Sequence, residues 1–292
     1  MQTEDSLRSP WNEFVFYFLK NRGAVIGLGF VFFFCLVAVL APLLSPFDPA
    51  EIHDGFRRLP PRWFAEGQGE FWLGTDDLGR DLLSRLIYGA RVSMGIGFFV
   101  VAVSLALGAS LGLLAGYRGG WIDTLIMRMT DVLMALPSML LAIVVVAILG
   151  PNLINAIFAV SLVEVPKFVR IIRAAVMGEK AKAYVTASRS FGASHWRQAV
   201  INILPNCMAP IIVQATLVFS EGILNAAALG FLGLGAQPPT SEWGSMLSDA
   251  RSYITDAPWQ VTLPGLCILI VVLGFNLFGD GLRDAFDPRL KQ

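Results

Sequence analysis

The sequence predicts an all-α integral membrane protein with six transmembrane helices. Of its 292 residues, 55% are hydrophobic and only 15% are charged. A soluble domain is usually about a quarter charged. The polar side chains are therefore too few to cover a water-facing surface of this size. Long uncharged runs, and basic residues gathered between alternate runs, support the same fold class.

A membrane-spanning helix needs about 20 apolar residues. The first run is preceded by Lys20 and Arg22 but is longer than the core of a signal peptide, so we interpret it as an uncleaved first helix. The run that begins at Val132 is too long for one helix and contains a turn signal, Gly150-Pro151-Asn152, which divides it into two spans. The fifth span is interrupted only by Glu221. The apolar runs are Ala24–Leu44, Val92–Tyr117, Val132–Val163 with its continuation toward Arg170, Ile203–Gly235 and Trp259–Gly279.

Basic residues predict the orientation, because cytoplasmic loops carry an excess of Lys and Arg. If six helices alternate, the N-terminus, the second and fourth connections and the C-terminal tail share one side. The opposite side also holds arginines, but acidic residues outnumber them. We therefore expect both termini to be cytoplasmic. The basic residues on the predicted inner side are Arg8, Lys20, Arg22, Arg118, Arg128, Lys167, Arg170, Arg173, Lys180, Lys182, Arg189, Arg197, Arg283, Arg289 and Lys291.

Two segments are predicted to lie outside the membrane. The outer loop, residues 46–91, is interpreted either as a solvated connector or as a docking surface for an external partner or neighbouring subunit. The inner segment runs from about Lys167 to Asn206, with a short helix expected over Tyr184–Val200. Gly192 permits a bend there, and Pro205 marks entry to the next span. Such a helix is either an ordinary solvated loop or a lever acting on the two attached spans.

Several kinds of chemistry have no motif in this sequence. It contains no G-x-x-x-x-G-K-[ST] loop for ATP phosphates and no G-x-S-x-G nucleophile motif. His53 and His195 lie outside any zinc motif, and Cys35, Cys207 and Cys267 have no metal-ligand spacing. The formal net charge of zero gives no indication of nucleic-acid binding. We expect no metal site and no catalysis by this chain alone.

The inner segment resembles the "EAA" signature of bacterial ABC importer permeases. Thr186-Ala187-Ser188 is followed at the required spacing by Gly192, and then by Leu204-Pro205. Three residues depart from the signature: Thr186 stands where Glu is usual, Ser188 replaces the second Ala, and Asn202 occupies the Ile position.

Three more stretches look like the C-type permease subunits of dipeptide and oligopeptide importers, closest to dipeptide permeases. The outer-loop stretch contains the family motif residues Gly74, Thr75, Asp76, Gly79, Arg80 and Asp81. The others are 228–239 with Glu242-Trp243-Gly244, and 279–284 with Asp287-Pro288.

This resemblance implies a type I importer fold, with a five-helix core behind one N-terminal helix. It divides the chain into the N-terminus and first helix (1–45), the outer loop (46–91), the transmembrane domain (92–280) with a coupling loop (176–205), and a cytoplasmic tail (281–292). It implies ATPase coupling through Thr186, Ala187, Ser188, Gly192, Leu204 and Pro205.

The implied partners are a second, homologous permease subunit, two ATPase subunits and a periplasmic or surface peptide-binding protein. ATP and Mg would bind the ATPases, so no cofactor is expected on this chain. The implied location is the bacterial inner membrane, surrounded by lipid.

The predicted mechanism is alternating access driven by the ATPases. Glu221 and Asn225, at i and i+4, form a polar stripe in the fifth span. Three interpretations of Glu221 remain open: it lines the path and meets a peptide's amino group, it pairs with a basic residue of the partner subunit, or it is protonated and hydrogen-bonded inside the bundle. Other functions considered are transport of a nickel chelate or glutathione, an ion-coupled carrier or channel, and a scaffold or membrane enzyme.

Overall fold

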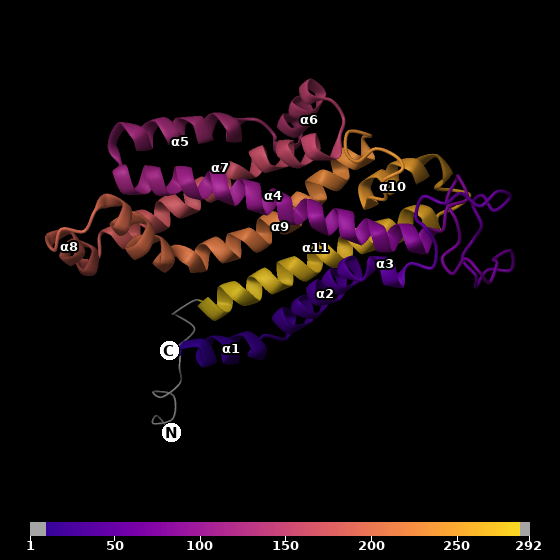
Figure 1. Cartoon of the computed structure of the whole chain (residues 1–292), viewed down its shortest axis with the longest axis horizontal. Coiled ribbons are helices and arrows are strands. Elements are labelled where there is room, and N and C mark those ends of the chain that lie inside the picture. Colours follow the sequence, from indigo (N-terminus) through magenta and orange to yellow (C-terminus); the bar gives the residue numbers. More distant parts are fainter. Residues whose placement is uncertain (1–9, 287–292) are drawn as a thin grey trace.

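The computed structural model describes residues 10–286 of the chain. Over these residues the protein is helical, and its long helices lie side by side along one direction (Figure 1). The short helices α8 and α10 lie at opposite ends of the bundle (Figure 1). Extended pairing in the described residues is limited to one bridge between Thr75 and Asp81. The helices are α1 (Pro10–Lys20), α2 (Arg22–Val39), α3 (Ala41–Leu44), α4 (Leu82–Arg118), α5 (Gly120–Ala135), α6 (Ser138–Leu149), α7 (Leu153–Lys180), α8 (Ala183–Ser190), α9 (Met208–Phe231), α10 (Trp243–Ala250) and α11 (Trp259–Phe286).

Four helical segments in the described part of the chain are long and apolar enough to cross a membrane. They are α2, α4, the continuous segment Arg197–Phe231 that ends with α9, and α11. α5 and α6 together make a fifth such unit, bent by 92° where they meet. α7 has 28 residues, or about 42 Å at 1.5 Å per residue, so its length also suffices. Its interior carries several charged residues. α7 corresponds to the fourth predicted span, the one that follows Gly150-Pro151-Asn152.

Two helix boundaries differ from the predicted ones. α4 begins at Leu82, within the segment predicted as outer loop, because the Asp81 carboxylate caps it by accepting the Ser84 backbone N–H at 2.7 Å. The apolar run that begins at Val132 breaks at the predicted turn after Leu149, but it also has an earlier break that was not predicted. Leu136 is extended, with φ −91° and ψ 141°, because the following Pro137 disfavours helical geometry at the residue before it.

The inner segment predicted over 167–206 is mostly helical. α7 continues to Lys180, so Lys167 lies inside a long helix rather than in a loop. The short helix predicted over Tyr184–Val200 is present but ends ten residues early, because α8 spans only Ala183–Ser190. A π-helix at Arg197–Ile203 and a 3₁₀ turn at Leu204–Cys207 then lead into α9. The predicted inner residues Arg8, Arg289 and Lys291, and the motif residues Asp287 and Pro288, lie outside the described residues.

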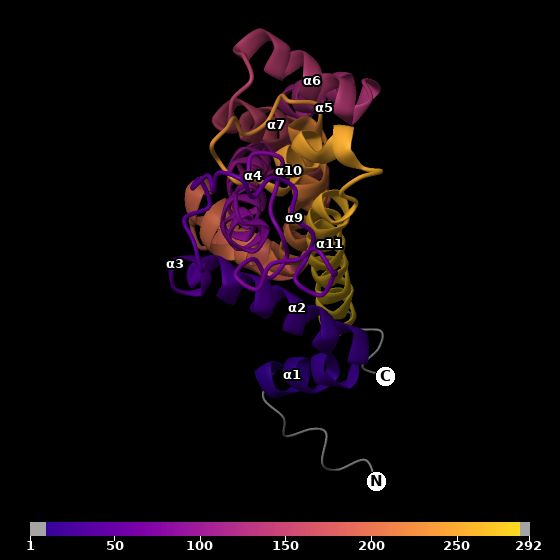
Figure 2. The ribbon, with the colours of Figure 1, turned by 90° about the vertical axis from the view of Figure 1, so that its right-hand side faces the viewer.

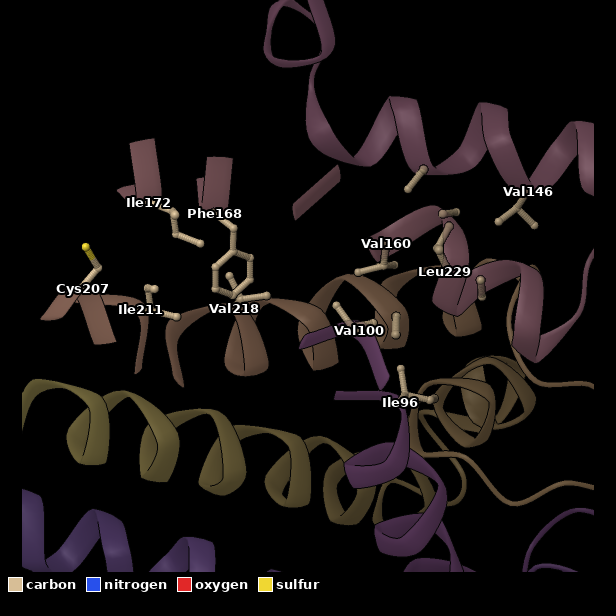
Figure 3. Packing of buried hydrophobic residues seen from close by; sticks show 14 of the residues in the cluster. Ile96, Val100, Val146, Val160, Phe168, Ile172, Cys207, Ile211, Val218 and Leu229 are labelled. Carbon is tan, nitrogen blue, oxygen red and sulfur yellow. The ribbon is translucent and has the colours of Figure 1, made fainter. Parts of the chain in front are cut away.

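α7 packs against α4, α9 and α6 and supplies much of the core. Figure 3 shows Phe168 and Ile172 of α7 above Val218 and Ile211 of α9. Toward the other end of the bundle the core is completed by Val160 of α7 with residues of α4, α6 and α9, namely Ile96, Val100, Val146 and Leu229 (Figure 3).

α4 approaches the backbone of α7 closely through Gly108, Gly112 and Gly116. A Cβ atom on Gly112 would lie 2.8 Å from the Val169 carbonyl oxygen. One on Gly116 would lie 2.9 Å from the Arg173 carbonyl oxygen. The spacing of four residues repeats the small-residue pattern that lets membrane helices pack at short range.

α1 and α2 lie at the edge of the bundle, against α4 and α11 (Figure 2). Phe34 of α2 packs edge-on to Trp243 of α10, with ring centroids 5.7 Å apart. Asn21 at the start of α2 donates to Asp284 of α11 at 2.9 Å. These two contacts fix α2 to α11 near its start and to α10 near its end.

Candidate functional site

The coupling segment is a short helix followed by a left-handed residue. Thr186, Ala187 and Ser188 lie in α8, and Gly192 follows with φ +79°. The backbone N–H of Gly192 donates to the Arg189 carbonyl at 3.0 Å, and that of Ala193 donates to the Ser188 carbonyl at 3.1 Å. These two bonds form a Schellman motif, in which glycine is favoured because it adopts a positive φ without strain. No heavy atom lies within 4 Å of a Cβ built on Gly192, so its conformation, rather than close packing, requires the glycine.

Two of the residues that depart from the family signature bond to each other. The Asn202 side-chain amide donates to the Ser188 hydroxyl at 2.7 Å. This contact joins α8 to the π-helical turn before α9. Leu204 and Pro205 form the next 3₁₀ turn, with Pro205 at its start, where a missing N–H does no harm. The segment is therefore held as one unit against the base of α9.

A second network fixes the start of α8. The Tyr184 hydroxyl donates to Glu179 of α7 at 2.9 Å, and Asn206 donates to Tyr184 at 3.2 Å. Burial, together with the neighbouring Glu179 carboxylate, raises the pKa of Tyr184. The hydroxyl therefore stays protonated and available as a donor at neutral pH.

The opposite face of the segment projects from the bundle. Thr186 and Ala187 are exposed, and Phe191 is 90% exposed.

The fifth span carries its polar stripe as predicted, and its partners lie on α7. Lys167 forms ion pairs with Glu221 of α9 and with Glu164, the latter at 2.8 Å. Asn225 donates to the other Glu164 oxygen at 3.3 Å. The Glu164 side chain is fully buried, whereas those of Lys167 and Glu221 are 33% and 49% exposed. These four residues, which we call the mid-span cluster, expose a charged patch on the side of the membrane helices.

Sequence reasoning missed Glu164 and Lys167 as members of this cluster. Lys167 was placed in a basic inner loop because a run of basic residues follows it. Farther along α7, Arg170 pairs with Asp131 at 2.7 Å and Arg173 with Asp123 at 2.5 Å, both on α5. The signal in the sequence is the spacing of Glu164, Lys167, Arg170 and Arg173 by three residues, which makes each one the neighbour of the next on the surface of α7. The row winds around the helix, so Lys167 meets α9 and the two arginines meet α5.

The outer-loop motif forms a compact, buried group of turns and ion pairs at the start of α4. Asp76 accepts from Arg80 at 2.6 Å and from Arg85 at 2.9 Å, and both arginines also approach Asp249 of α10, at 3.7 and 3.6 Å. Thr75 accepts the Leu59 N–H at 2.9 Å, and its own carbonyl accepts from Gln260 of α11 at 3.1 Å. The motif thus ties the outer loop to three helices.

The two glycines of the motif lie in the turns of this buried group. Gly74 and Gly79 both have positive φ values, +80° and +90°. Thr75, Asp76, Arg80 and Asp81 are all buried, so this motif offers no surface to a partner. The large exposed hydrophobic side chains of the outer loop are Ile52, Trp63, Phe64, Trp72 and Leu78.

The family stretch that contains Glu242-Trp243-Gly244 packs against α4 and α9. Glu242 caps α10 by accepting the N–H groups of Gly244 and Ser245 at 2.7 and 2.8 Å. Burial raises the pKa of the Glu242 carboxyl. Trp243 is fully buried, and its indole N–H donates to the Leu86 carbonyl at 3.1 Å. These residues are structural, and no cluster of His, Cys, Asp and Glu suited to a metal occurs among residues 10–286.

Comparisons with known proteins agree with this architecture. Residues 108–292 match the family described as the inner membrane component of binding-protein-dependent transport systems. Residues 9–61 match the N-terminal transmembrane domain of oligopeptide transport permease C. One chain of the inward-facing MetNI methionine ABC transporter superposes with a TM-score of 0.57 at 16% identity, over 70% of this chain and 98% of that one. This likeness shows the type I importer fold.

Curated relatives cover almost the whole chain. The dipeptide transport system permease protein DppC of Haemophilus influenzae is 54% identical, over 98% of this chain and 97% of its own. The di/tripeptide permease protein DppC of Pseudomonas aeruginosa is 56% identical, over 97% and 93%. The glutathione permease protein GsiD of Pectobacterium atrosepticum is 45% identical, over 99% and 94%. The chain therefore belongs to the family of binding-protein-dependent transport system inner membrane components, as a multi-pass permease subunit of an ATP-driven importer.

Proposed function

We propose that this chain forms half of the translocation path for dipeptides and that the mid-span cluster lines that path. The two relatives at 54% and 56% identity are a dipeptide and a di/tripeptide permease. The glutathione relative is less similar, at 45%. Dipeptides are therefore the favoured substrate, with glutathione or another short peptide-like solute as the alternative.

The observation that carries the proposal is the half-exposed charge of the mid-span cluster. A charged residue at the centre of a membrane helix costs about 2.5–3.5 kcal/mol by insertion scales. Glu221 is 49% exposed on its isolated chain, so its open side must meet water or a second subunit rather than lipid. Two carboxylates and one ammonium group leave the cluster with an excess of negative charge. That excess would attract the protonated amino group of a peptide.

The same contacts weaken the other two interpretations of Glu221. Its carboxylate already has a cation in its own chain, Lys167, so it needs no basic residue from the partner. The ion pair also removes the need for it to be protonated within the bundle.

α8 supplies the proposed connection to the ATPases. Its exposed Thr186, Ala187 and Phe191 would enter a groove of an ATPase subunit, while Ser188 and Gly192 hold the helix in place. ATP and Mg would bind the two ATPases, and this chain would not hydrolyse ATP. A second permease subunit would complete the path, a binding protein would deliver the peptide, and both termini would be cytoplasmic.

The test measures uptake of a labelled dipeptide in cells that lack only this chain and are complemented with variants. Glu221→Gln is expected to reduce uptake about tenfold or more while the assembled transporter is recovered normally. Asp131→Asn, which removes an equally exposed carboxylate from another ion pair, is the matched control and should retain uptake. Reduced recovery of the permease pair with Glu221→Gln would assign the residue to the subunit interface. Unchanged uptake and assembly would remove Glu221 from the path.

The substrate is tested separately by competition. An excess of unlabelled dipeptide should abolish uptake, and glutathione should not. The reverse order would contradict the dipeptide assignment while leaving the permease fold and the path intact.

A further inference from the structure

A continuous groove lies beside the α8 end of α4. Its larger part, about 520 Å³, lies between α4 and the turns that lead into α9. Its smaller part, about 260 Å³, lies between the end of α4, the end of α7 and α8. Tyr117, Arg118 and His195 line both parts. The two parts therefore meet at these three side chains.

The larger part of the groove is apolar. Leucine, alanine and valine side chains line most of it, including Leu113, Leu114 and Val200. Trp196, 72% exposed, stands at its edge. Tryptophan and tyrosine at the end of a membrane helix are typical of the interface between lipid and water.

The smaller part is cationic. Arg118, Lys180 and Arg189 line it, and no carboxylate does. Within the part of the chain that the structure describes, none of these three forms an ion pair. Lys180 instead donates to the Tyr117 carbonyl at 2.5 Å, and the Tyr117 hydroxyl bonds to His195 at 2.8 Å. Three positive charges thus converge without a counter-charge from their own chain.

We propose that this groove binds an anionic phospholipid. The acyl chains would lie along the apolar part against α4, and the phosphate would lie among Arg118, Lys180 and Arg189. Basic pockets at the ends of membrane helices suit acidic headgroups in this way, and arginine matches phosphate geometry with two parallel hydrogen bonds. The proposal uses the membrane location of the chain and is independent of its substrate.

The position of the groove gives the bound lipid a consequence for coupling. Arg118 ends α4, whereas Arg189 belongs to α8. A phosphate held between them would link the coupling helix to a membrane helix with which, among the described residues, α8 shares no hydrogen bond. The lipid would act as a structural ligand of the coupling segment.

The test uses the assembled transporter in lipid nanodiscs that contain a photoactivatable phosphatidylglycerol or, in parallel, the matching phosphatidylcholine. Labelled peptides are mapped by mass spectrometry. We expect phosphatidylglycerol to label the peptides around Tyr117 and Trp196, and phosphatidylcholine to label them much less. The double variant Arg118→Gln/Arg189→Gln should lose label at least tenfold, since each cation near an acidic lipid surface is worth roughly a fivefold change in binding.

Two further variants separate charge from folding. Arg118→Lys/Arg189→Lys keeps both charges and should retain most of the label. Arg251→Gln removes one exposed arginine beside α10, at the other end of the bundle, and should label as the wild type does. Equal labelling by the two lipids, undiminished labelling of the double Gln variant, or label absent from the groove because another subunit fills it would each overturn the proposal.

Discussion

Replacing Gly112 by alanine should separate α4 and α7. A Cβ on Gly112 would lie 2.8 Å from the Val169 carbonyl oxygen and 3.0 Å from the Ile172 Cβ. The first obstacle is backbone and has no rotamer by which to move away. The methyl group therefore fits only if α4 and α7 shift apart along their contact.

The expected cost follows from this overlap. Adding a methyl group to a well-packed core typically costs about 1–3 kcal/mol. Alanine is about 1 kcal/mol better than glycine inside a helix, which offsets part of that cost. We therefore expect a net loss of up to about 2 kcal/mol in the free energy of unfolding relative to the wild type, and of about 1–3 kcal/mol relative to a Gly→Ala change in the same helix that meets no obstacle. The neighbouring core residues Phe168 and Ile172 are fully buried and leave little room for relaxation.

The assay is unfolding of the purified chain in detergent micelles, followed by circular dichroism during titration with a denaturing detergent. Gly95→Ala is the matched control, because it lies in the same helix and a Cβ there meets no heavy atom within 4 Å. The control should be as stable as the wild type or slightly more stable. If Gly112→Ala were as stable as Gly95→Ala, the close α4–α7 contact would be wrong.

Three further outcomes are expected. Gly192→Ala should lower the ratio of peptide uptake to ATP hydrolysis, because a left-handed alanine costs about 1–2 kcal/mol. Gly178→Ala is the control, since its Cβ meets nothing within 4 Å, and it should leave that ratio unchanged. Equal ratios for the two variants would contradict the Schellman assignment. Because the pKa of Glu242 is raised in the folded protein, the folded state binds a proton there more tightly than the unfolded state does. Protonation of Glu242 therefore stabilises the fold at low pH, and this stabilisation is lost as the pH rises through the raised pKa. The stability of the wild type relative to Glu242→Gln should therefore increase as the pH falls from neutral toward the ordinary glutamate pKa of 4.5, and a constant difference in melting temperature would argue against it. In a variant without native cysteines, an impermeant thiol reagent should label cysteine at Gly69 from outside and cysteine at Ser194 only from inside; label at Ser194 from outside would invert the proposed topology.

The helices were predictable where a single local rule decides. Apolar length marked α2, α4, α9 and α11, and the turn at Gly150 separated α6 from α7. The break at Pro137 follows an equally local rule, but the apolar run continues on both sides of it, so hydropathy does not reveal it. The early start of α4 depended on the Asp81 cap, whose signal is a side chain in the outer-loop motif.

The inner half of α7 required knowledge of its neighbours. Lys167, Arg170 and Arg173 indicate a cytoplasmic loop if each charge must reach water on its own. In the structure each has an acidic partner on α9 or α5, so the helix can carry them within the bundle. Those partners lie 39 to 54 residues away. The spacing of the charges along α7 is visible in the sequence, but the pairing that stabilises them is a property of the fold.

The coupling segment shows how two departures from a family motif can compensate each other. Read singly, Ser188 and Asn202 are polar residues at positions where the signature has alanine and isoleucine. The structure places them 2.7 Å apart, so each satisfies the other at a partly buried site where an unpaired amide would cost about 1–3 kcal/mol. A hydrogen bond between α8 and the turn before α9 thus stands where the signature has two apolar residues. Thr186 differs from both, because its side chain is exposed on the face that α8 presents outward. Its departure from glutamate therefore concerns the partner surface, whereas the Ser188–Asn202 pair concerns how firmly α8 is attached to the helix that it is proposed to move.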